Sequence, residues 1–235
     1  MVIAGLQKMT LLDYPGKVAC TVFLRGCNFR CPFCHNSGIL DGSVQPALTQ
    51  PELLAFLEKR RGILDGVCIT GGEPTLQPGL KELLSPIKAL GFNLKLDTNG
   101  SRPEVLKEMV LEGLVDYVAM DIKNCPSRYD ETAGAQGTAA CVEESMRFLL
   151  TGAVDYEFRT TVVEEFHDAA AMEEMRQWLK NLAPDTKAKR IFIQPYMDRD
   201  SVLQQGLHTP SAEKLRIFAE ILAPCAETIT IRAMD

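Results

Sequence analysis

The sequence predicts an α/β fold, a parallel sheet with outer helices, organised as a single domain. Apolar, β-branched runs alternate strictly with segments of helical periodicity along most of the chain. Six or seven such units are too few for a full eight-fold barrel, so we expect a partial barrel or a strongly curved open sheet. The 235 residues, 46% of them hydrophobic, are enough to bury a substantial core.

The predicted strands are short runs rich in Val, Ile and Thr, as is typical of buried parallel strands. They cover residues 18–24, 66–70, 93–98, 117–123, 156–163, 190–196 and 228–232.

The predicted helices carry apolar residues on one face. Thr49 and Glu52 form a capping box, Pro86 predicts a kink, and Thr209 is the expected cap of the last helix with Pro210 at its first position. The loosest segments are 36–46 and 124–137. The helices cover residues 49–60, 77–91, 102–113, 138–152, 168–182 and 209–223.

Composition argues against a nucleic-acid-binding, membrane or secreted protein. The net charge of −6 gives no basic surface for nucleic acid or an anionic membrane. No apolar run approaches the roughly 20 residues that span a bilayer, and the start shows no secretory signal. Eight cysteines in such a chain indicate the cytoplasm and thiolate chemistry rather than disulfide bonds.

Polar motifs follow successive predicted strands. Because the carboxyl ends of parallel strands form the functional face of such folds, we expect these residues to share one site. They are the cysteine motif after the first strand, Gly71, Gly72 and Glu73 after the second, Asp97, Thr98 and Asn99 at the third, Asp121 and Lys123 at the fourth, and Arg159 within the fifth.

The cysteine motif is C-x3-C-x2-C, at Cys27, Cys31 and Cys34. Thiolates bind zinc or iron–sulfur clusters, but a closed zinc site needs a fourth ligand, and His35 is awkwardly placed for that role beside Cys34. A four-iron cluster on three thiolates leaves one iron open to a small molecule. The five other cysteines are expected to be small core hydrophobes, namely Cys20, Cys68, Cys125, Cys141 and Cys225.

The cysteine motif with Phe33 before its third cysteine, together with the sequence GGEP at 71–74, resembles the radical S-adenosylmethionine (SAM) superfamily. The resemblance implies a partial (β/α)6 TIM-like barrel over residues 1–235, with a cluster loop at 25–46. It also implies a radical SAM oxidoreductase with a [4Fe–4S] cluster on the three cysteines and SAM bound at the open iron. Reductive cleavage of SAM would then give a 5′-deoxyadenosyl radical that abstracts hydrogen.

The stretches "LLDYPGKVACTVFLRGC" and "NFRCPFCHN" resemble short activating enzymes of glycyl radical enzymes, of the pyruvate formate-lyase and anaerobic ribonucleotide reductase kinds. Gly16 and Lys17 stand one or two positions from the usual signature. No cysteine-rich ferredoxin insertion separates Cys34 from Gly71, so we expect one cluster. The implied partners are a large glycyl radical enzyme, anaerobic ribonucleotide reductase above others, and a flavodoxin or ferredoxin as electron donor.

The resemblance also assigns roles at the strand ends. It implies that Asp97, Thr98 and Asp121 hold a monovalent ion, Na+ or K+. A carboxylate pair with a hydroxyl is hard-oxygen coordination, which suits an alkali or alkaline-earth ion. The structural alternatives are a solvated charge pair for Asp97 and Asp121 and surface salt bridges for Lys123 and Arg159. For Glu73 the alternative is a hydrogen-bond acceptor in a turn. The residues expected to contact SAM are Phe33, Gly71, Gly72, Glu73, Asn99, Lys123 and Arg159.

One departure and two alternatives remain. Met197 stands where activases often have histidine, while Gln194 and Tyr196 are expected to line the site. One alternative is another radical SAM enzyme acting on a small molecule or a peptide, such as a 7-carboxy-7-deazaguanine synthase. The other is a non-enzymatic zinc or iron–sulfur module. Residues expected to have ordinary structural roles are His167, His208 and Trp178.

Overall fold

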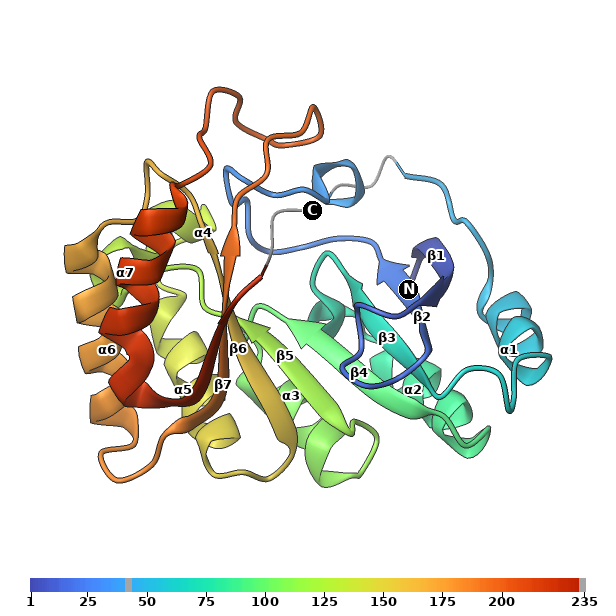
Figure 1. Ribbon diagram of the computed structural model, residues 1–235. Coiled ribbons are helices and arrows are strands. Elements are labelled where there is room, and N and C mark those ends of the chain that lie inside the picture. The colour runs from blue at the N-terminus through green and yellow to red at the C-terminus, as the bar shows by residue number, and fades with distance from the viewer. Residues whose placement is uncertain (41–43, 233–235) are drawn as a thin grey trace. The chain divides into compact units, whose positions relative to one another are not determined.

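The computed structural model of the chain describes residues 1–40 and 44–232 and has the α/β organisation that the sequence predicts (Figure 1). Eight strands form one sheet in the order β1-β2-β3-β4-β5-β6-β7-β8. The pairs β2–β3, β3–β4, β6–β7 and β7–β8 are parallel, whereas β1–β2 is antiparallel. The strands are β1 (Ile3–Thr10), β2 (Ala19–Leu24), β3 (Gly66–Gly71), β4 (Asn93–Thr98), β5 (Tyr117–Asp121), β6 (Asp155–Val162), β7 (Ala188–Pro195) and β8 (Ala226–Ile231).

The six predicted helices are all confirmed, and a short one is added. Thr49 and Glu52 form the predicted capping box of α1, and the Asp168 carboxylate caps α6 by accepting from the Ala171 N–H. Ser211, rather than the predicted Thr209, caps α7, because the Thr209 hydroxyl donates to the Tyr196 carbonyl at 2.7 Å. The helices are α1 (Gln50–Glu58), α2 (Leu80–Ala89), α3 (Pro103–Leu111), α4 (Tyr129–Ala133), α5 (Ala139–Leu150), α6 (Ala169–Leu182) and α7 (Ala212–Leu222).

The chain forms two compact units, and β5 contributes to both. The first unit holds residues 1–28, 38–98 and 104–119, and therefore β1–β4, α1–α3 and the start of β5. Its core is built from the interior strands and the apolar face of α2. Val22, Val67 and Leu94 are fully buried in the strands, as are Leu83 and Ile87 in the helix.

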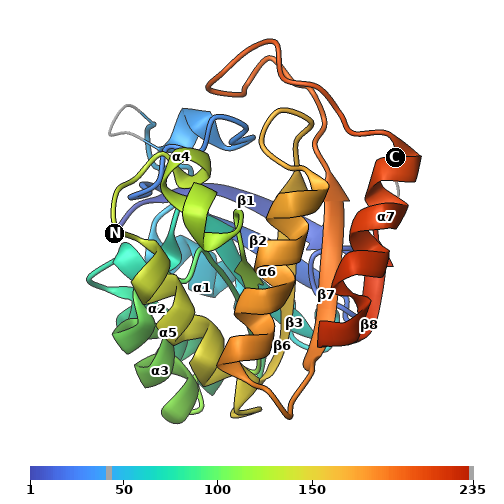
Figure 2. The same cartoon turned by 90° about the vertical axis from the view of Figure 1, so that its left-hand side faces the viewer.

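The second unit holds residues 29–37, 99–103 and 120 onward, and therefore the end of β5, α4–α7 and β6–β8. Helices α6 and α7 pack side by side (Figure 2). Trp178 on α6 is buried, as predicted, and its indole N–H donates to Glu143 of α5 at 2.8 Å. This unit carries Cys31, Cys34 and the charged residues that follow β5.

Three features differ from the sequence predictions. Strand β1 was not predicted, because Gln7, Lys8 and Met9 are exposed and its register with β2 is irregular. Helix α4 lies within the segment 124–137 that was expected to be irregular. Cys141 is exposed on α5, so the prediction that it is a core residue was wrong, whereas Cys20, Cys68, Cys125 and Cys225 are buried.

Residues 41–43 of the expected cluster loop lie outside the described residues. No helix in the described part of the chain is long and apolar enough to cross a membrane.

Candidate active site

The GGEP turn follows β3 and lies against the beginning of the cysteine loop. The Gly72 N–H donates to the Leu24 carbonyl and the Glu73 N–H to the Gly26 carbonyl, both at 2.8 Å. A Cβ atom on Gly72 would lie 2.0 Å from the Gly26 oxygen, so only glycine allows this approach. Since Gly26 precedes Cys27, the first unit joins two of the motifs that the sequence singled out.

The Glu73 carboxylate is fully buried beneath this turn. Its Oε1 accepts from the Thr75 N–H at 3.0 Å and from the Thr98 hydroxyl at 2.8 Å, and it caps the short 3-10 helix Pro74–Leu76. The carboxylate thus acts as a turn acceptor, the structural alternative to a SAM-facing role. Through Thr98 it also connects the ends of β3 and β4.

The Asp97 carboxylate near the end of β4 has a cationic partner, Lys95, with which it forms an ion pair. The Lys95 side chain is only 1% exposed. The Thr70 hydroxyl donates to the other Asp97 oxygen at 3.2 Å. Sequence reasoning missed Lys95, although strand alternation places it on the same face as Asp97.

Cys31 and Cys34 lie in the second unit on a loop supported by α4. The Cys34 N–H donates to the Cys31 carbonyl at 3.0 Å, and the Arg30 N–H donates to the Ala133 carbonyl at 2.9 Å. Gly134 ends α4 in the left-handed conformation, with φ +60°. A Cβ there would lie 2.3 Å from the Arg30 oxygen, so this glycine lets α4 approach the loop.

A cluster of three charges comes from the end of β5, the residues after it and the interior of β6. Asp121 accepts from Lys123 at 3.1 Å and from the Arg159 Nε–H at 2.8 Å. Burial opposes ionisation of Asp121, but the charges and hydrogen bonds of Arg159 and Lys123 prevail and hold its pKa well below its usual range. Burial likewise opposes the Lys123 charge, but Asp121 holds the pKa of this lysine well above its usual range.

The charge of Lys123 also acts on Cys31. Burial raises the pKa of the Cys31 thiol, and the positive charge of Lys123 opposes that rise. Lys123 is itself held in place by its backbone, because its N–H donates to the Tyr129 hydroxyl at 3.3 Å and its carbonyl lies 2.9 Å from His167 Nε2. His167 therefore has the structural role expected of it.

His35 contacts the segment around Met197. His35 Nε2 lies 2.8 Å from the Met197 carbonyl, and its ring stacks on Tyr196 at 5.7 Å between centroids. Burial lowers the pKa of His35, so the imidazole is neutral at pH 7. The structure thus connects the residue after Cys34 to the segment in which this chain lacks the activase histidine.

The remaining predicted residues have structural contacts of their own. Phe33 is buried, with its ring 6.2 Å from that of Phe166. Asn99 is buried, and its side-chain oxygen accepts from the Ser101 N–H at 2.9 Å. His208 is exposed and pairs with Glu165.

The donor chemistry fits a cluster and SAM. All eight cysteines are thiols, and Cys27, Cys31 and Cys34 are the three that share one loop. The glycine turn offers backbone at close approach, and Lys123 and Arg159 offer cations for a carboxylate. The thiolates that hold an iron–sulfur cluster each bind a different iron atom, so they need not converge on a single metal ion. Within residues 1–40 and 44–232, no group of three or more His, Cys, Asp or Glu could hold a metal ion.

The donor set fits a monovalent cation poorly. In the first unit Asp97 is already paired with Lys95, and in the second Asp121 is paired with Lys123 and Arg159. The two carboxylates among the predicted cation ligands thus each have a positive partner within their own unit.

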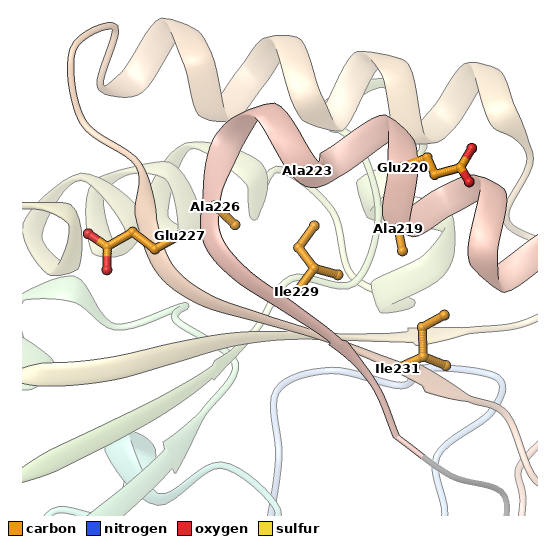
Figure 3. Close-up of a pocket in the computed structure, with 7 residues that line it drawn as sticks. All are labelled: Ala219, Glu220, Ala223, Ala226, Glu227, Ile229 and Ile231. Carbon is orange, nitrogen blue, oxygen red and sulfur yellow. The ribbon is translucent and has the colours of Figure 1, made fainter.

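In the described part of the chain, hollows are also found away from the predicted site residues. One of about 480 Å³ lies beside β8, with Glu220 and Glu227 at its two sides (Figure 3). Another of about 330 Å³ lies near the N-terminus. The first is lined by Ala219, Glu220, Ala223, Ala226, Glu227, Ile229 and Ile231, the second by Met1, Val2, Ile3, Pro46, Leu48, Thr49, Gln50, Gly79 and Glu82.

Comparison with known proteins gives a family match and several relatives. The model of the Radical SAM superfamily matches residues 21–178. A protein of Methanocaldococcus jannaschii, provisionally named a glycyl-radical enzyme activating enzyme, is 28% identical over 99% of this chain and 96% of its own length. A pyruvate formate-lyase-activating enzyme of Clostridium pasteurianum is 34% identical, but the match covers only 52% of each chain.

Two further matches bear on function and fold. A 7-carboxy-7-deazaguanine synthase of Thermococcus kodakarensis is 30% identical over 69% of this chain and 71% of its own length. The crystal structure of a domain of pyruvate-formate lyase-activating enzyme from Bacteroides vulgatus matches with a TM-score of 0.59 and 22% identity, over 72% of this chain and 99% of that one. The structural match supports the predicted fold class.

Proposed function

Because the chain belongs to the radical SAM superfamily, we propose that it is an activase, which reductively cleaves SAM and takes a hydrogen atom from a glycine of a partner enzyme. The observation that carries the proposal is the bond between the GGEP turn and Gly26, because it joins the turn to the residue before Cys27. The full-length relative of M. jannaschii supports the choice of an activase within the superfamily.

The family implies a [4Fe–4S] cluster and SAM as cofactors. Cys27, Cys31 and Cys34 would hold the cluster, which when bound supplies the electron that cleaves the sulfonium of SAM. The positive charge of Lys123 favours the thiolate form of Cys31. The residues that would contact SAM are Phe33, the backbone of Gly71, Gly72 and Glu73, and Asn99, Lys123 and Arg159.

The partners follow from this activity. The protein substrate would be a large glycyl radical enzyme, with anaerobic ribonucleotide reductase the first candidate, and the electron donor a flavodoxin or ferredoxin in the cytoplasm. Residues 1–235 would serve as one radical SAM domain, with the cluster loop at 25–46 and without a second cluster between Cys34 and Gly71.

The test is formation of 5′-deoxyadenosine from SAM by anaerobically reconstituted protein reduced with dithionite. Wild type should form it, Cys31→Ala should not, and Cys141→Ala should behave as wild type because Cys141 is exposed on α5 and is not part of the motif. Equal rates for wild type and Cys31→Ala would refute the proposal. A glycyl radical signal in electron paramagnetic resonance of an added partner would then identify the substrate.

A second candidate is supported by the T. kodakarensis relative, which the chain matches over most of both lengths. A chain with the activity named for that relative would form 7-carboxy-7-deazaguanine and give no glycyl radical on a partner. Iron and sulfide analysis separates both enzymes from a zinc module, which would contain stoichiometric zinc without sulfide.

A further inference from the structure

Lys95 is a lysine inside the sheet of the first unit. Its side chain is 1% exposed, and its ammonium pairs with the Asp97 carboxylate, which is 14% exposed. The Lys95 Nζ also lies 3.8 Å from the Cys68 sulfur on the neighbouring strand β3. A buried ammonium is costly unless it is paired, so the position of Lys95 depends on Asp97.

The partners of Asp97 show how its charge is balanced. Lys95 and the Cys68 thiol, which is 3.7 Å away, approach Oδ1, while the Thr70 hydroxyl donates to Oδ2 at 3.2 Å. Lys95 lies two residues before Asp97 on β4, so alternation along the strand places both side chains on one face. One positive and one negative charge therefore form a neutral pair beside the strand end.

The other residues predicted to hold a cation form hydrogen bonds or ion pairs with protein groups. The Thr98 hydroxyl donates its hydrogen to Glu73, and Asp121 is neutralised within the second unit by Lys123 and Arg159. An alkali ion at Asp97 or Asp121 would lie beside an ammonium or a guanidinium, whose positive charge repels it.

We propose that Lys95 is a built-in cation, whose ammonium does at Asp97 what a sodium or potassium ion was expected to do. Lys95 is thus a positioning residue that balances the charge of Asp97 and holds its carboxylate in place, and the protein needs no alkali ion. This charge balance does not depend on the proposed function. Its consequence for SAM binding does rest on the proposed function, so the two are measured separately.

The first experiment needs neither cluster nor SAM. The thermal midpoint of metal-free protein is measured in KCl, NaCl and choline chloride at equal ionic strength. Wild type should unfold at the same temperature in all three salts. Lys95→Met should be less stable in choline chloride and should regain part of the loss in KCl or NaCl, because an ion can then occupy the vacated position.

The matched control is Lys88→Met. Lys88 pairs with Asp116 at 2.5 Å in the same unit, but its side chain is 30% exposed. This variant should lose some stability in every salt and should not distinguish potassium from choline. If Lys95 had only a structural role, Lys95→Met would behave like this control and lose the same stability in every salt. That outcome would overturn the proposal.

The second experiment measures the dissociation constant of SAM with reconstituted protein. Wild type should bind SAM equally in KCl and choline chloride, whereas Lys95→Met should bind about tenfold more weakly in choline chloride than in KCl. Wild type that melts higher or binds SAM more tightly in KCl overturns the proposal. Absence of SAM binding by wild type, with the melting results as expected, refutes the proposed function alone.

If Lys95→Met does not fold, the proposal is tested with wild type and Lys95→Arg. Lys95→Arg keeps the positive charge and should remain insensitive to the choice of cation, and a potassium response in either protein overturns the proposal.

Discussion

The N–H of Glu73 donates a 2.8 Å hydrogen bond to the carbonyl of Gly26, the residue immediately before Cys27. Two residues 47 positions apart in the sequence (73 − 26) are thereby joined through backbone atoms. Backbone contacts of this kind depend on the absence of side chains, so substitution of the glycines tests them directly.

Gly72→Ala should destabilise the protein by about 2 kcal/mol, because its Cβ would lie 2.0 Å from the Gly26 oxygen. Urea unfolding measures the loss, and iron and sulfide content after reconstitution should fall with it. Gly38→Ala, in the segment that follows the cysteines, is the control, since a Cβ there meets nothing within 4 Å. Its effect should stay within about 0.5 kcal/mol, and equal effects of the two substitutions would contradict the prediction.

Gly134→Ala should cost about 2 kcal/mol more than Gly137→Ala in the free energy of unfolding. Both glycines have a positive φ, +60° and +68°, so alanine is strained at each. Only at Gly134 would the new Cβ also meet backbone, 2.3 Å from the Arg30 oxygen. Chemical denaturation of both variants checks the difference, and similar losses would show that α4 does not support the cysteine loop through this contact.

Thr98→Val should destabilise the protein by about 2 kcal/mol, because the fully buried Glu73 carboxylate would lose a hydrogen bond of 2.8 Å. Thr228→Val is the control. Thr228 is an exposed strand threonine whose hydroxyl also donates a hydrogen bond, to the Lys189 carbonyl at 3.1 Å. Thr228→Val should lose less than about 0.5 kcal/mol of unfolding free energy in the same urea titration. Equal losses in Thr98→Val and Thr228→Val would argue against a buried hydrogen bond.

Asp121→Asn should cost about 3 kcal/mol at pH 7, because it leaves Lys123 and Arg159 without their carboxylate. The folded protein holds the pKa of Asp121 below the usual value of about 3.9. The unfolded chain therefore takes up a proton first as the pH falls. The stabilisation is present above about pH 4 and is lost as the pH falls further, so the two proteins should converge in acid.

Urea titrations of wild type and Asp121→Asn between neutral and acid pH measure this convergence. Asp155→Asn is the control, since Asp155 also pairs with two cations, Lys189 and Arg190, but its side chain is 42% exposed. Its cost should not exceed about 1 kcal/mol. A constant difference between wild type and Asp121→Asn across the pH range would show that Asp121 is not titrating as predicted.

Local signals predicted most of the fold. Apolar periodicity located six helices, and Thr49 with Glu52 defined the start of α1 correctly. Strand β1 was missed because its pairing with β2 depends on a long-range register, with shifts at both ends, rather than on alternation. Cys141 was misplaced because composition does not tell which face of a helix a cysteine occupies.

The candidate site was predicted as a set of residues, without their partners. Adjacent motifs such as Gly71, Gly72 and Glu73 are visible in the sequence, but the Gly26 carbonyl that receives the Glu73 N–H is not. Lys95 was missed because a single lysine in an apolar strand has no significance until the carboxylate beside it is known to be buried with it. Charge pairing is a property of three-dimensional neighbours, which spacing alone does not give.

Strand β1 has a consequence for the loop that carries Cys27. By pairing with the outer side of β2, it makes the strand that leads to the cysteines an interior strand, hydrogen-bonded to β1 on one side and β3 on the other. Amide protons of β2 should therefore exchange with deuterated water only when the sheet opens as a whole. The strand before the cysteines should therefore keep its amide protection whether or not the cysteines hold a metal.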